Sequence, residues 1–241
     1  MPFELTAVLL LLAGAAAGYL IGSISFAVII TKIFKNTDVR EHGSGNAGMT
    51  NVMRTAGALP GTLTLACDFL KAVAAVLIGR YLLIPIMQSV APSEAVRLAI
   101  EPVYGAFICG IGCFLGHIYP IFFGFRGGKG ALVALGTLLM IDWQVFLIVA
   151  AVFLIMFFFT KIVSLSTLTA AVVYPVATFL LFPYTHLNET ALFGISSRLI
   201  QTAFASVIVI IVFIKHIDNI KRLIAGEEKA IVRGSKPRGG S

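Results

Sequence analysis

Two glycine-rich stretches carry much of the polar chemistry of this 241-residue chain. The first, residues 42–51, reads HGSGNAGMTN and is followed closely by Arg54. The second, residues 116–130, reads GHIYPIFFGFRGGKG and includes Lys129. The backbone N–H groups of such loops, with hydroxyl or amide side chains and a cation nearby, can converge on an anion. The two stretches therefore predict binding of two anionic groups.

Neither stretch is a nucleotide-binding motif. A Walker loop needs Ser or Thr after its lysine, whereas Gly130 follows Lys129. A dinucleotide fingerprint needs a preceding strand, and none is predicted. The three cysteines all lie in apolar runs, so we interpret them as packing residues rather than as metal ligands or disulfide partners. We expect no nucleotide, no cofactor and no metal.

One charged pair lies within an apolar run. Asp68 and Lys71 are three residues apart and therefore share a helix face. An isolated charge at the centre of a bilayer costs about 2.5 to 3.5 kcal/mol, so the two should pair or face the interior of the protein. Two roles remain open for them: an ion pair that supports the first glycine-rich stretch, or direct catalysis.

Further polar residues follow or begin the late apolar runs. His216 and Asn219 are three residues apart, so they can face the same anion site. Ser164 and Ser166 begin the sixth run on the same side, where they could also cap a helix.

The composition excludes a water-soluble globule. Apolar residues make up 59% of the chain and charged residues 12%, against roughly 25% charged in an ordinary soluble domain. A helix needs about 20 residues to cross the hydrocarbon layer. Seven apolar runs are candidates, at residues 4–31, 60–83, 98–116, 129–141, 143–160, 164–183 and 198–215. The chain is predicted to be an all-α integral membrane protein.

The fourth run decides the topology. Its 13 residues would give only about 20 Å of helix, so a re-entrant segment is the alternative to a crossing. With seven crossings, 14 of the 18 Lys and Arg residues fall on one side. Without the fourth crossing the basic tail would be translocated, against the positive-inside tendency. We therefore predict seven transmembrane helices, with the N-terminus outside and the C-terminus in the cytoplasm.

The seven helices are expected to form one bundle. Gly14, Gly18 and Gly22 form a stripe of small residues that predicts close packing of the first helix on a neighbour. Residues 1–233 are predicted to be a single membrane domain, and residues 234–241 a disordered tail. The net charge of +7 marks topology and anion binding, and nucleic acid is not an expected partner.

At these residues the chain resembles the bacterial acyl-phosphate:glycerol-3-phosphate acyltransferases, the PlsY family of seven-span membrane enzymes. The matching segments are 43–46 with 50–51 and Arg54, 116–120 with 127–130, 68–71, and His216 with 219–220 and 222–223. The chain departs from the family pattern at Ala72, Val133 and Ile217–Asp218, beside the predicted ligand-binding residues.

The resemblance implies a reaction and a set of residues. An acyl group would pass from acyl phosphate to the 1-hydroxyl of glycerol 3-phosphate, giving 1-acyl-glycerol 3-phosphate and phosphate. The enzyme would lie in the bacterial cytoplasmic membrane, with its active site on the cytoplasmic side. The implied catalytic residues are Ser44, Asp68, His216 and Asn219. The implied substrate-binding residues are Gly43, Gly45, Asn46, Thr50, Asn51, Arg54, Lys71, His117, Gly127, Gly128, Lys129 and Ser166.

The residues agree with that reaction on several counts. Both substrates carry a phosphate, which accounts for two basic sites. The acyl chain would lie among the transmembrane helices. Phosphate is a good leaving group, so we expect direct attack without a covalent acyl-enzyme. The base could be a substrate phosphate, which we favour, His216 or Asp68. A transporter of a phosphate-containing anion is the competing hypothesis, although inverted repeats are not clear in the chain.

Overall fold

The structure is a computed structural model in which residues 2–185, 191–192 and 195–230 are described. The predicted tail at 234–241 lies outside these ranges. The described chain is helical apart from one short antiparallel pair, β1 (Ala191–Leu192) and β2 (Ile195–Ser196). The all-α prediction is confirmed.

Six helical segments of the described chain are long and apolar enough to cross a membrane. The first three segments each join several elements. Phe3–Lys35 joins α1 (Phe3–Gly22) and α2 (Phe26–Lys35), Ala58–Ser89 joins α4 (Ala58–Ile78), the π-helical turn η2 (Gly79–Leu83) and α5 (Ile84–Ser89), and Pro102–Phe123 joins α7 (Pro102–Ile118) and the 3₁₀ turn η3 (Ile121–Phe123). The other three are α9 (Trp143–Thr160), residues Val163–Leu181 of α10 (Val163–Thr185), and α11 (Ser197–Lys215). The protein is therefore of the integral membrane class.

The fourth predicted span forms a short helix, α8 (Ala131–Ile141). Its 11 residues give about 16 Å, so it is not among the six candidate spans. The other short elements are η1 (Val39–Glu41), α3 (Met49–Ala56), α6 (Glu94–Ala99) and α12 (Ile217–Ile224). Seven crossings remain a prediction.

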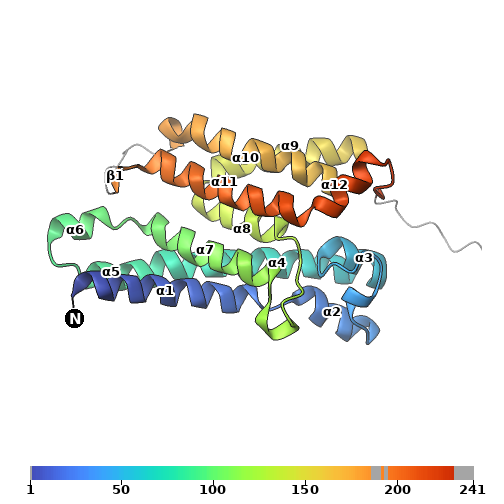
Figure 1. The fold of residues 1–241 in the computed structure, drawn as a ribbon, viewed down its shortest axis with the longest axis horizontal. Helices are drawn as coiled ribbons and strands as arrows, with labels where there is room; N and C mark the ends of the chain where they lie inside the picture. Colours follow the sequence, from blue (N-terminus) through green and yellow to red (C-terminus); the bar gives the residue numbers. More distant parts are fainter. Residues whose placement is uncertain (1, 186–190, 193–194, 231–241) are drawn as a thin grey trace, which may run out of the picture.

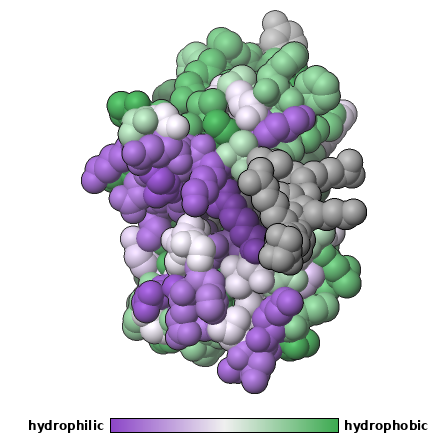
Figure 2. Space-filling model, turned by 90° about the vertical axis from the view of Figure 1, so that its right-hand side faces the viewer, coloured by the Kyte–Doolittle hydropathy of each residue, from purple (hydrophilic) through white to green (hydrophobic). Residues whose placement is uncertain are grey.

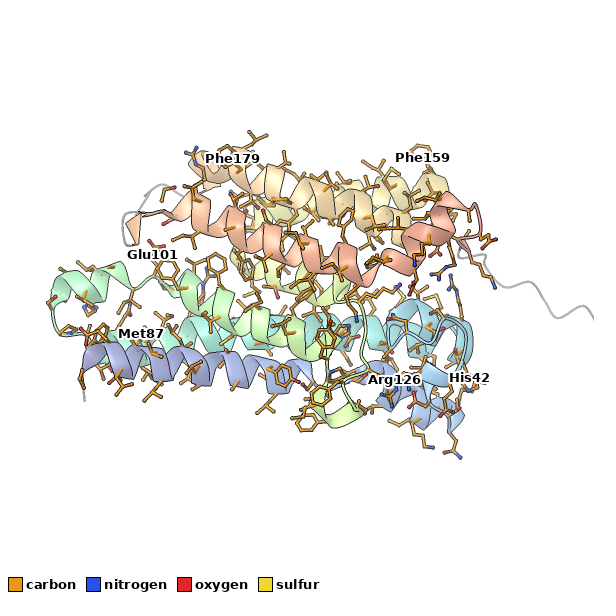
Figure 3. The ribbon with its side chains drawn as sticks, in the orientation of Figure 1. His42, Met87, Glu101, Arg126, Phe159 and Phe179 are labelled. Atoms are coloured by element: carbon orange, nitrogen blue, oxygen red, sulfur yellow. The ribbon has the colours of Figure 1, made fainter. Side chains whose placement is uncertain are left out.

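The helices form two layers with α8 between them (Figure 1). One layer holds α1, α4 and α7, and the other holds α9, α10 and α11. At one end of the bundle lie α3 and α12, whereas α8 begins farther inside. Hydrophilic side chains gather on the end that carries α3 and α12 (Figure 2). On the outer layer, Phe159 and Phe179 point away from the bundle, as expected for a lipid-facing surface (Figure 3).

Local chemistry explains the tight connections around α8 and α9. The Asp142 carboxylate accepts hydrogen bonds from the backbone N–H groups of Gln144 and Val145, at 3.1 and 3.0 Å, and so caps α9 directly after α8 ends. At the other end of α9, Lys161 adopts a left-handed conformation with φ of 57°, which ends the helix before α10 begins. These two turns make α8, α9 and α10 successive neighbours.

The glycine stripe of α1 packs on α7, as predicted. A Cβ atom on Gly18 would clash with the backbone carbonyl of Cys109, and one on Gly22 with that of Cys113. The Cys109 thiol lies 3.3 Å from the carbonyl oxygen of Gly14, to which it donates. The two helices approach so closely because no side chain separates their backbones.

Candidate active site

A cavity of about 210 Å³ lies near the polar end of the bundle and extends between α8, α9, α10 and α11. Its polar end is lined by Asn46, Thr50, Asp68, His117, Lys129 and His216, all of which were predicted site residues. The rest of its lining is almost entirely apolar. The cavity thus joins a polar entrance to a hydrophobic interior.

Two helices begin beside this entrance. Helix α3 begins after Gly48 and α8 begins after Gly130, and neither has a side-chain cap. Gly48, Met49, Gly130 and Ala131 all line the cavity. The first-turn N–H groups and the positive end of each helix dipole favour an anion there. Both predicted anion-binding stretches therefore lead into a helix whose first residues line the cavity.

The structure corrects the predicted role of Gly127 and Gly128. Their N–H groups donate to the carbonyl oxygens of Ile118 and His117, at 3.2 and 3.1 Å. A Cβ atom on Gly128 would clash with the His117 ring. These amides are therefore used to fold the loop back against the end of α7. The free amides nearest Lys129 are instead those of the first turn of α8.

Asn51 shapes the first stretch from beneath. Its side-chain oxygen accepts from the Ser44 N–H at 3.0 Å, and its side-chain nitrogen donates to the carbonyls of Val39, His42 and Asn46 at 2.9, 2.9 and 3.1 Å. Only 1% of Asn51 is exposed. Its predicted contact with substrate is corrected to a positioning role, since the whole amide is engaged within the loop.

Other predicted residues of this stretch lie outside the cavity. Gly43, Ser44 and Gly45 are exposed and are not among its lining residues. Gly43 and Gly45 have φ of 59° and 68°, a conformation that favours glycine and turns the loop. His216 lines the cavity and Ser44 does not, so the catalytic role of Ser44 remains a prediction.

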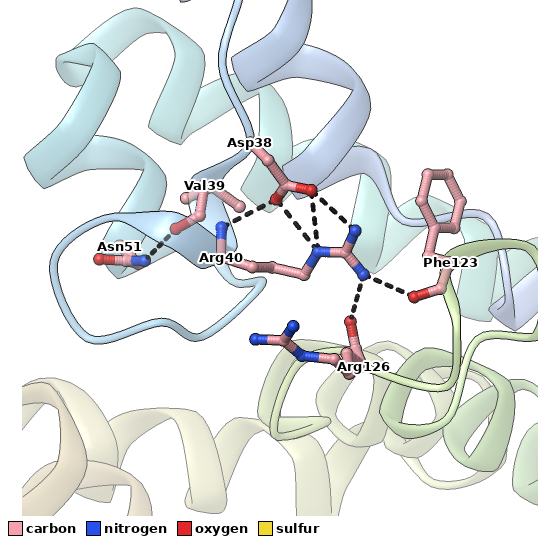
Figure 4. Close-up of polar contacts among 6 residues, drawn as sticks. All are labelled: Asp38, Val39, Arg40, Asn51, Phe123 and Arg126. Carbon is pink, nitrogen blue, oxygen red and sulfur yellow. Dashed lines mark hydrogen bonds and ion pairs between the residues drawn. The ribbon is translucent and has the colours of Figure 1, made fainter.

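Arg40 fastens the two stretches together (Figure 4). Its guanidinium pairs with Asp38 at 2.7 Å and donates to the carbonyl oxygens of Phe123 and Arg126 at 2.5 and 3.3 Å. Charge counting treated Arg40 as a topology marker only. Its structural role depends on a contact across 83 residues of chain, for which the local sequence carries no signal.

The buried pair Asp68–Lys71 joins the site to a break in the first span. The Lys71 ammonium lies 2.8 Å from the Asp68 carboxylate and 3.0 Å from His117 Nδ1. It also donates to the carbonyl oxygens of Gly22 and Ile24, at 3.0 and 2.8 Å, where α1 ends. An ammonium has three protons, and all are used here. The predicted substrate contact of Lys71 is therefore corrected to a supporting role, whereas Asp68 and His117 face the cavity.

Lys129 is held beside a small polar network. Its ammonium donates to the side-chain oxygen of Asn219, whose nitrogen donates to Glu228 at 2.5 Å. Glu228 also accepts from Ser164 at 2.7 Å and from Arg222 at 2.6 Å. The predicted pair of Lys129 and Asn219 is thus brought together. Glu228 was missed, since two adjacent acidic residues in a basic segment give no distinctive pattern.

Two more predicted residues lie at the edge of this network. The Ser166 hydroxyl donates to the Ile162 carbonyl within its own helix at 2.8 Å, and the residue does not line the cavity. Ser164, and not Ser166, therefore joins the polar network. Arg54 is exposed and donates to the carbonyl oxygen of Lys229 at 3.2 Å.

Burial sets the charge states at the entrance. It lowers the pKa of Lys129 to about 8, with a further contribution from the Arg222 guanidinium. It also lowers the pKa of His216 to about 4, so this ring is neutral near pH 7. His216 Nδ1 donates to the Val212 carbonyl at 2.8 Å, so Nε2 carries no proton and can only accept a hydrogen bond. His216 itself lines the cavity.

Comparison with known proteins gives one consistent match. Residues 12–226 match the family model described as glycerol-3-phosphate acyltransferase. A glycerol-3-phosphate acyltransferase from Mesorhizobium japonicum is 42% identical over 214 residues, which cover 89% of this chain and 92% of the relative. One from Neisseria meningitidis serogroup A is 38% identical over 217 residues, covering 90% and 94%.

Solved structures agree with the sequence matches. The crystal structure of PlsY, an integral membrane glycerol 3-phosphate acyltransferase, in its glycerol 3-phosphate form has a TM-score of 0.69 and 32% identity. The match covers 94% of this chain and 96% of that one. The lysophosphatidic acid form has a TM-score of 0.66 and 31% identity, with the same coverage.

Proposed function

Because this chain belongs to the glycerol-3-phosphate acyltransferase family, we propose that it acylates glycerol 3-phosphate to lysophosphatidic acid with an acyl phosphate as donor. The observation that carries the choice of donor is the cavity, whose entrance is suited to anions and whose interior is suited to an acyl chain. An acyl phosphate would place its phosphate at the polar entrance and its acyl chain in the apolar interior.

The reaction needs no covalent intermediate on the protein. The 1-hydroxyl oxygen of glycerol 3-phosphate attacks the carbonyl carbon of the acyl phosphate. The bond from that carbon to the phosphate oxygen then breaks, and inorganic phosphate leaves with the electron pair. The hydroxyl proton passes to a substrate phosphate, whose second pKa of about 6 makes it a base near neutral pH.

The residues at the entrance divide the work. Lys129 at the entrance binds substrate phosphate, aided by the N-termini of α3 and α8, and Arg54, which is exposed on α3 outside the cavity lining, is a second proposed phosphate contact. Neutral His216 orients glycerol 3-phosphate by accepting a hydrogen bond from its 2-hydroxyl at Nε2, so that the proton of the attacking 1-hydroxyl is left to the substrate phosphate. Asn219 and the first-turn amides stabilise the oxyanion that forms on the carbonyl oxygen.

A kinetic experiment tests donor and mechanism together. The detergent-purified protein should release phosphate from palmitoyl phosphate only when glycerol 3-phosphate is also present, because no acyl-enzyme forms. Initial rates with both substrates varied should give intersecting double-reciprocal lines. Parallel lines together with a trapped acyl-enzyme would contradict direct attack.

The same assay separates the two roles of His216. In the His216→Ala variant turnover should fall, and added imidazole should not restore it, since an orienting contact depends on the fixed ring. Recovery by imidazole with both substrate affinities unchanged would make His216 the base. Activity with acyl-coenzyme A but not with acyl phosphate would overturn the proposed donor.

We also propose seven crossings of the bacterial cytoplasmic membrane, with the entrance facing the cytoplasm. The short α8 supports a seventh crossing because it begins inside the bundle (Figure 1), so that it has less than a full bilayer to traverse. The basic loops and tail support the orientation through the positive-inside tendency.

Single cysteines in a background without native thiols test this topology. Cysteines at Arg126 and Lys161 should resist an impermeant thiol reagent in intact cells, whereas one at Ser93 should react. Permeabilised cells provide the control, in which all three should be labelled. Labelling of Arg126→Cys from outside would reverse the orientation, and labelling of Lys161→Cys alone would remove the fourth crossing.

A further inference from the structure

We propose that Tyr174 forms the floor of the acyl-chain cavity and thereby sets which chain lengths of donor the enzyme prefers. This inference rests on the proposed function of the cavity and adds a residue that limits its depth.

The lining of the cavity ends at a buried residue on each of the four surrounding helices. The lining residues farthest from the entrance are Leu138 on α8, Val149 on α9, Tyr174 on α10 and Ile208 on α11. They are 2%, 7%, 6% and 1% exposed, so they are closed off on their far side. Tyr174 has the largest side chain of the four.

Close packing continues directly beyond these residues. About one helical turn beyond the floor lie Val145 on α9, Ala177 on α10 and Ala205 on α11. They belong to the same buried cluster as Tyr174 and do not line the cavity. A chain that reaches the ring therefore meets packed core, and it can lengthen only if the ring moves.

Helix geometry gives the depth. Val163 near the entrance and Tyr174 are 11 positions apart on α10, which is about 16 Å, and His216 and Ile208 are separated by about 12 Å along α11 and its continuation. An extended alkyl chain advances roughly 1.25 Å per carbon, given single bonds of about 1.5 Å at tetrahedral angles. The cavity thus holds roughly ten to thirteen carbons before the chain reaches the ring.

The ring should discriminate among longer chains. A chain longer than the cavity must strain the packed core around the ring, which costs about 1 to 3 kcal/mol, or roughly 5- to 150-fold in affinity. Removing the ring in Tyr174→Ala should therefore raise kcat/KM for an 18-carbon acyl phosphate, relative to a 12-carbon one, at least tenfold. Tyr174→Phe is the matched control, because it keeps the ring and should leave the ratio unchanged.

A second variant moves the floor the other way. Ala170 lies one turn nearer the entrance on α10 and also lines the cavity. Ala170→Leu should lower kcat/KM for a 12-carbon acyl phosphate, relative to an 8-carbon one, at least tenfold, while leaving the KM for glycerol 3-phosphate unchanged. This variant decides the matter if Tyr174→Ala does not fold.

The outcomes distinguish this inference from the proposed function. An unchanged chain-length ratio in folded, active Tyr174→Ala or Ala170→Leu protein would contradict the proposed role of Tyr174. It would not affect the proposal that acyl phosphate is the donor. Failure of the wild-type protein to use acyl phosphate of any length would instead overturn the donor and, with it, the basis of the inference.

Discussion

Lys129→Ala protein should lose roughly 10- to 100-fold in kcat/KM for glycerol 3-phosphate. A charge-assisted hydrogen bond contributes about 1.5 to 3 kcal/mol, and Lys129 is a half-buried cation that lines the cavity entrance. The corrected role of Gly127 and Gly128 makes this residue more important, since those amides cannot compensate for it. Steady-state kinetics in detergent provide the measurement.

The pH profile gives the same prediction a second readout. The ammonium is present below its pKa and is lost above it, so wild-type kcat/KM should decrease as the pH rises through about 8. Lys129→Arg should retain its cation and should not show this decrease, whatever its absolute rate. Lys161→Ala, which removes an exposed lysine from another loop, should leave kcat/KM unchanged. Wild-type kinetics in folded Lys129→Ala protein would refute the assignment.

Lys71→Met should strongly destabilise the fold. Removing one partner of a buried ion pair costs about 3 to 5 kcal/mol, because the other charge is left uncompensated. In this protein the Asp68 carboxylate would be left, and the carbonyls of Gly22 and Ile24 would lose their donor. Denaturant unfolding in detergent should show the loss.

A double variant separates support of the fold from catalysis. Asp68→Asn with Lys71→Met should recover part of the lost stability, since no isolated carboxylate remains. If Asp68 were instead a catalytic base, Asp68→Asn alone would remain as stable as the wild type yet lose turnover. Unchanged stability of Lys71→Met would mean that the pair does not support the break between α1 and α2.

Much of the fold could be predicted, because its determinants are local. Runs of apolar residues predict helices through their length, and the stripe at Gly14, Gly18 and Gly22 predicts through its spacing that a neighbouring helix packs closely on the first. That this neighbour is α7 is seen only in the structure. The break at the end of α1 was not predicted. Its freed carbonyls are satisfied by Lys71, which lies 49 residues away from Gly22 along the chain, so the local sequence gives no warning.

The candidate site could be predicted in composition more than in geometry. The lining residues Asn46, Thr50, Lys129 and His216 all came from motifs. Which polar groups remain free within those motifs depends on loop hydrogen bonds, as Asn51 illustrates. Glu228 lies outside all of these motifs. It reaches Asn219 and Arg222 only because the chain turns back after α12, which the sequence does not reveal.

The inward start of α8 has a kinetic consequence (Figure 1). In the proposed reaction, the reacting groups meet below the polar end of the bundle, because the loop before α8 folds back on α7, and the acyl chain lies among helices. The two substrates then obey different concentration scales. The rate should follow the molarity of glycerol 3-phosphate in water but the mole fraction of the donor in the membrane, so diluting the donor with inert lipid slows the enzyme even when its bulk concentration is constant.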